Sequence, residues 1–97
     1  MQYRYQTKLI HFYKSFELIY LGAAYVGNKE LDKALSTFDQ LIQSDSFDSS
    51  KGYWCKLLIY LQQENTVEIQ KTLELILENP ANFNYKKAQK IQESLGF

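Results

Sequence analysis

Residues 20–42 read YLGAAYVGNKELDKALSTFDQLI, two apolar runs separated by the polar break GNKE. On both sides of the break, apolar residues recur every three or four positions, which is the spacing of a helix with one buried face. Gly22 stands in the first run and Ala34 in the second, so each run has a small residue where a neighbouring helix could come close. The stretch predicts two helices joined by a tight turn.

Helical spacing continues outward from this stretch in both directions, and no segment shows the period-two alternation of a strand. Gly27 and Asn28 are suited to the left-handed conformation that ends a helix, Thr66 to an N-cap, and Gly96 to a stop. The prediction is an all-α fold in a single domain, residues 1–97, with helices at about 5–27, 30–44, 49–63, 66–78 and 84–95.

Composition excludes several classes of protein. Eleven basic and eleven acidic residues give no net charge, which argues against a generic binder of nucleic acid or of membrane surfaces. The single Cys55 excludes an intramolecular disulfide and a multi-cysteine zinc site, and its apolar surroundings in the sequence favour a small buried residue. The sequence shows no secretory signal and no transmembrane span, so a cytoplasmic location is expected unless the chain is a fragment.

An internal repeat becomes visible when the sequence is shifted by 35 residues. Apolar positions of the first helix pair then fall on apolar positions of the second. The matched pairs are Ile19 with Trp54, Ala23 with Leu58, Tyr25 with Tyr60, Val26 with Leu61, Ala34 with Ile69, Phe38 with Leu73, Leu41 with Ile76 and Ile42 with Leu77. A helix–turn–helix unit repeating at this period is typical of helical solenoids.

The first unit, residues 15–48, resembles the tetratricopeptide repeat (TPR), which has a leucine-glycine pair, a tyrosine, an alanine and a large apolar residue at the intervals of Leu21-Gly22, Tyr25, Ala34 and Phe38. A second unit, about 50–81, departs from that pattern at the glycine and alanine positions. The end of the chain resembles the half-repeat that caps such arrays. The resemblance implies antiparallel helix pairs stacked as a short right-handed superhelix.

TPR arrays hold a peptide or an extended segment in a groove lined by the first helix of each pair. The resemblance therefore implies a non-catalytic protein–protein interaction module with an apolar, aromatic groove, whose partner is a peptide, a helix or a second copy of the chain. Few polar residues could grip a carboxylate there, so a carboxylate clamp is disfavoured. The expected partner-binding residues are Phe16, Ile19, Ala23, Val26, Lys51, Trp54, Leu58, Leu61 and Gln62.

The long first helix also has heptad spacing, at positions 9, 12, 16, 19, 23 and 26, with Tyr13 and Tyr20 beside that stripe. Heptad spacing suits pairing with another helix. Two interpretations remain open at this point: a homodimer formed through the stripe, or a stripe that is simply the core of the monomer.

Other functions have less support. A 35-residue period also fits pentatricopeptide repeats, which read single-stranded RNA, but the neutral charge fits poorly, and the cluster Lys86, Lys87 and Lys90 suits a solvated cap. A purely structural capping segment of a longer repeat protein is the other alternative. His11 alone cannot supply a metal site, and Asp45 and Asp48 are too sparse for a calcium loop. No enzymatic activity, cofactor or metal is expected.

Overall fold

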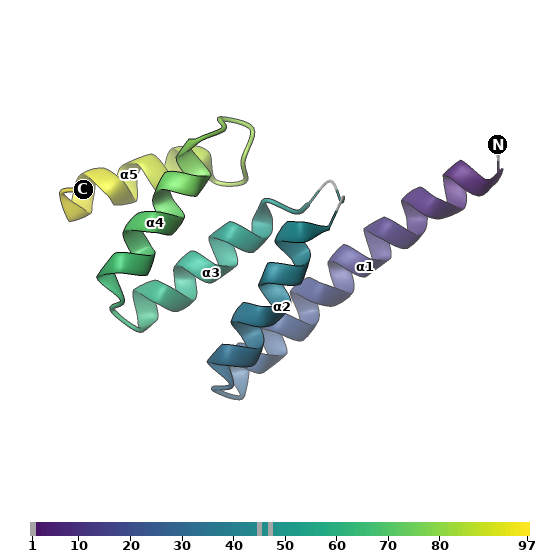
Figure 1. The fold of residues 1–97 in the computed structure, drawn as a ribbon, viewed down its shortest axis with the longest axis horizontal. Coiled ribbons are helices and arrows are strands. Elements are labelled where there is room, and N and C mark those ends of the chain that lie inside the picture. The colour runs from purple at the N-terminus through teal and green to yellow at the C-terminus, as the bar shows by residue number, and fades with distance from the viewer. Residues whose placement is uncertain (1, 45, 47) are drawn as a thin grey trace. The chain divides into compact units, whose positions relative to one another are not determined.

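The computed structural model describes the backbone of residues 2–44, 46 and 48–97, and side chains from Lys14 onward within those ranges. Over these residues the fold is all-α, as predicted, with helices α1 (Gln2–Gly27), α2 (Leu31–Gln43), α3 (Lys51–Gln62), α4 (Thr66–Leu77) and α5 (Tyr85–Leu95) (Figure 1). Every helix boundary lies within three residues of its expected position. The chain forms two compact units, one ending at Gly52 and the other comprising Tyr53–Phe97.

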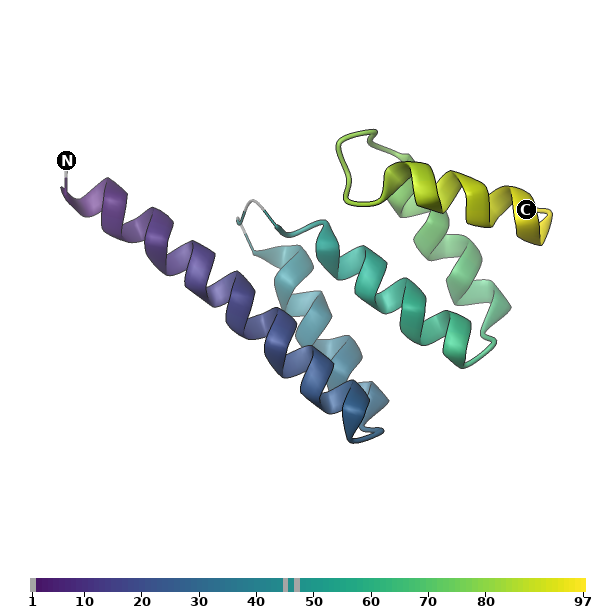
Figure 2. The ribbon, with the colours of Figure 1, turned by 180° about the vertical axis from the view of Figure 1, so that it is seen from behind.

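Helices α1 and α2 form an antiparallel hairpin that makes up most of the first unit (Figure 2). One face of α2 packs against α1 and is fully buried; its residues, spaced three and four apart, are Ala34, Thr37, Phe38 and Leu41. A Cβ atom added to Gly22 would lie 2.3 Å from a ring carbon of Phe38, so the missing side chain makes room for that ring. This agrees with the predicted role of Gly22 in the close approach of the two helices.

Gly52 has a similar role that the sequence analysis did not identify. A Cβ atom at this position would lie 2.6 Å from Cγ1 of Ile42 and 2.9 Å from the backbone oxygen of Phe38. The first turn of α3 therefore approaches α2 at a distance that only glycine allows. Helical spacing within the predicted helix 49–63 does not show which of its residues faces a neighbouring backbone, so this role of Gly52 could not be predicted.

The turns that end α1 and α3 are the same structure 35 residues apart. At the end of α1, Glu30 N donates to Tyr25 O and Lys29 N donates to Val26 O; at the end of α3, Asn65 N donates to Tyr60 O and Glu64 N donates to Leu61 O. These paired bonds define a Schellman motif, which satisfies the last carbonyl groups of a helix. The repeat inferred from apolar spacing is thus present in the backbone.

Two details of these turns differ from expectation. The left-handed residue after α1 is Lys29, with φ of 62°, rather than Gly27 or Asn28, and its counterpart after α3 is Glu64, with φ of 54°. The hydrogen-bond pattern of the Schellman motif fixes which position turns left-handed, and it does so here without a glycine. The N-cap of α4 is Asn65, whose Oδ1 accepts from the backbone N of Glu68 at 3.3 Å, and Thr66 is the first helical residue.

Buried threonines repeat at the same interval. Thr37 Oγ1 donates to Lys33 O at 2.8 Å in α2, and Thr72 Oγ1 donates to Glu68 O at 2.7 Å in α4. Each hydroxyl thereby satisfies its donor within its own helix, which lets a polar side chain sit on a buried face.

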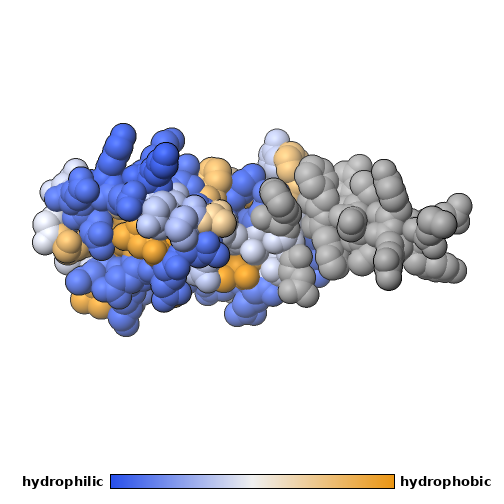
Figure 3. Space-filling view, turned by 90° about the horizontal axis from the view of Figure 1, so that it is seen from above, coloured by the Kyte–Doolittle hydropathy of each residue, from blue (hydrophilic) through white to orange (hydrophobic). Residues whose placement is uncertain are grey.

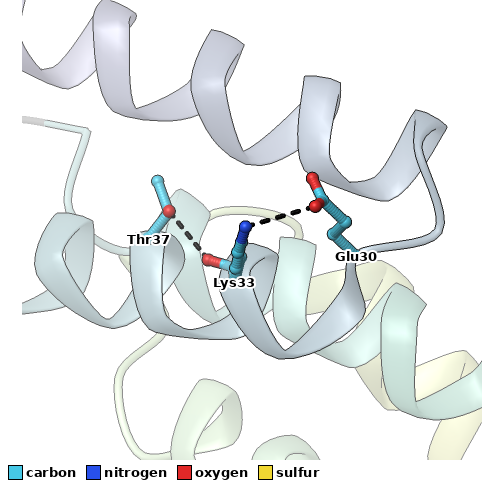
Figure 4. A network of polar contacts seen from close by, with 3 residues as sticks. All are labelled: Glu30, Lys33 and Thr37. Atoms are coloured by element: carbon cyan, nitrogen blue, oxygen red, sulfur yellow. Dashed lines mark hydrogen bonds and ion pairs between the residues drawn. The ribbon is translucent and has the colours of Figure 1, made fainter.

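On the outside of α2, Lys33 Nζ pairs with Glu30 Oε1 at 3.2 Å (Figure 4). That pair is largely solvent-exposed and contributes little to stability.

In the second unit, α3 and α4 form a hairpin and α5 packs on α4 (Figures 1 and 2). Its buried apolar residues are Leu57, Ile59, Tyr60, Ile69, Leu73, Ile76 and Ala88. Asn82 Nδ2 donates to Leu75 O and Ile76 O, capping the end of α4 two residues after Pro80. Gly96 is left-handed and ends α5 with the same pair of backbone bonds seen after α1 and α3, in agreement with its predicted role as a stop.

Replacing the left-handed residues with glycine is expected to stabilise the protein. A residue with a Cβ atom pays about 1–2 kcal/mol for this conformation, and glycine avoids that strain at some cost in unfolded-state entropy. Lys29→Gly and Glu64→Gly should therefore each raise the free energy of unfolding by about 0.5–1 kcal/mol, measured by urea denaturation. Asn28→Gly is the matched control, because Asn28 does not have a positive φ, and it should not stabilise. Equal effects at positions 28 and 29 would contradict the assignment of the turn.

Candidate partner-binding faces

The charged and metal-ligating residues considered in the sequence are scattered over the described part of the chain. No group of three or more His, Cys, Asp and Glu side chains there could hold a metal ion. Glu17 is exposed on α1 and Asp48 pairs with Lys51, while the side chain of His11 and all of Asp45 lie outside the described residues. Among the described residues, no helix combines the length and the apolar character needed to cross a membrane.

The first of the predicted faces lies on α1. Phe16 and Ala23 are exposed there, with 54% of the Phe16 side chain accessible. Tyr20, which lies between them and is 66% exposed, belongs to the same strip, although it was expected only to widen the stripe. The Phe16 and Tyr20 rings are 5.0 Å apart between centroids and tilted by 48° to each other, so the two rings are in contact along the helix.

Ile19 and Val26, also predicted for this face, are half-buried. An α-helix advances about 100° per residue, so both side chains lie to one side of Phe16, toward the flank on which Ser15, Leu18 and Gly22 are buried. Ile19 and Val26 therefore form the edge of the exposed strip, between it and α2. The exposed strip is rotated by part of a turn from the one that the sequence predicted.

The second predicted face lies on α3. Leu58 is 49% exposed and Gln62 is exposed, while Lys51, Trp54 and Leu61 are half-buried. These residues are spaced three, four, three and one apart and share one side of the helix. Ile59, next to Leu58, is buried although the sequence analysis did not place it in the core. Ile59 therefore lies in the interior, while the adjacent Leu58 lies in solvent.

Lys51 is less available than its sequence position suggests. Its Nζ lies 3.1 Å from Oδ1 of Asp48, three residues earlier in the chain. A carboxylate ligand would have to compete with this ion pair for the ammonium group. Whether α3 grips a carboxylate stays a prediction of the sequence.

Three of the predicted positions related by the 35-residue repeat have the same degree of exposure on the two helices, whereas Phe16 is exposed and its counterpart Lys51 is half-buried. Ala23 and Leu58 are both exposed, Ile19 and Trp54 are both half-buried, and so are Val26 and Leu61. The equivalence of the two exposed faces is therefore partial and centres on Ala23 and Leu58. The partner-binding residues predicted on α1 belong to the first compact unit, and most of those predicted on α3 belong to the second. Within each helix, the predicted residues share one side.

Hydrophobic side chains are also exposed outside α1 and α3, among them Val67 on α4 and Leu95 on α5. In the coloured part of the face shown in Figure 3, hydrophobic residues form small patches separated by hydrophilic side chains. Lys86, Lys87 and Lys90 on α5 are all exposed, as expected of a solvated cap. Comparison of the chain with models of protein families, with curated proteins and with solved structures gave no match.

Proposed function

We propose that this chain is a non-catalytic protein–protein interaction module of the TPR type. The observation that carries the proposal is that the first helix of each pair leaves apolar side chains in solvent: Phe16 and Tyr20 on α1 and Leu58 on α3. Leu58 is also at the position equivalent to the exposed Ala23 of α1. In a solenoid the first helices of the pairs line the surface that receives a partner. Such a surface needs exposed side chains on the first helix of every helix pair.

The energetics support this assignment. Burying apolar surface stabilises a protein or a complex by about 25 cal/mol for each Å² removed from water. Leu58 keeps nearly half of its surface exposed while its neighbours Leu57 and Ile59 are buried. A partner that covers Leu58 and the half-buried Trp54 and Leu61 recovers that free energy without rearranging the helix. Helices held by packed cores make a preorganised surface, which lowers the entropic cost of binding.

The proposal is tested by capture of partners from the native host with the purified chain and the Leu58→Glu variant. A carboxylate at position 58 would have to be desolvated against an apolar partner, so we expect capture to fall at least tenfold. Val67→Glu is the matched control, because Val67 is 61% exposed on α4, the second helix of the same hairpin. Capture that is equal for the Leu58→Glu and unmodified chains, with unchanged circular dichroism, would refute the α3 assignment.

A further inference from the structure

We draw no further inference here: the strongest candidate, the exposed apolar face of α1 formed by Phe16, Tyr20 and Ala23, is an unpartnered helix face, and nothing in the structure shows what covers it.

Discussion

Replacing Phe38 with alanine is expected to lower the free energy of unfolding by about 3–5 kcal/mol, the usual cost of removing a buried aromatic side chain. The ring is buried in the α1–α2 hairpin and occupies the space opened by Gly22. With the ring gone, the adjoining positions offer little to fill that space, since Gly22 has no side chain and Ala34, one turn before Phe38 on α2, is small. The cavity should therefore persist, which places the effect toward the upper end of the range.

The measurement is urea denaturation followed by far-ultraviolet circular dichroism. Phe16→Ala is the control, because it removes the same side chain from an exposed position of the same hairpin. Its effect should stay within about 0.5 kcal/mol. Comparable losses for Phe38→Ala and Phe16→Ala would mean that the packing of the Phe38 ring on Gly22 is not what stabilises the hairpin.

Much of this fold could be predicted because its signals are local. Helical spacing of apolar residues located all five helices, and the 35-residue shift located the repeat, since the same contacts recur at the same offsets. The structure shows that the 35-residue repeat also includes features that the spacing of apolar residues does not reveal. Thr37 and Thr72 bond in the same way to the backbone four residues earlier, and Lys29 and Glu64 adopt the same left-handed conformation.

The remaining details depend on how a helix is rotated about its axis, which the sequence constrains weakly. Ile19 and Tyr20 are adjacent, and both have large apolar surfaces, so the sequence allows either residue to belong to the exposed strip. The contact of Gly22 with Phe38 turns Ile19 toward α2 and leaves Tyr20 in solvent. Leu58 and Ile59 present the same ambiguity on α3, and there too the structure buries one and exposes the other.

Helical spacing predicted which of the expected partner-binding residues share a helix face, and the binding itself stays a prediction. All nine residues expected to bind a partner lie on α1 or α3, and those on each helix share one side. The likeness to TPR proteins rests on the sequence pattern, and the identity of a partner depends on shape and charge that no spacing rule encodes. Tyr20 could have been included with the signal in hand, because it lies one helical turn after Phe16.

In the second unit, Leu73→Ala is expected to lower the free energy of unfolding by about 2–5 kcal/mol. Leu73 is fully buried on α4 and occupies the repeat position of Phe38, so it is the residue on which the second hairpin should depend most. Leu75→Ala, two residues away and 41% exposed, removes the same atoms from the solvent side of the same helix and should cost less than about 1 kcal/mol. Hydrogen exchange should show lower protection of α4 in the Leu73→Ala variant and little change in the Leu75→Ala variant. If the two substitutions cost the same, the core of the second unit is not organised by the repeat, and the equivalence between Phe38 and Leu73 has to be abandoned.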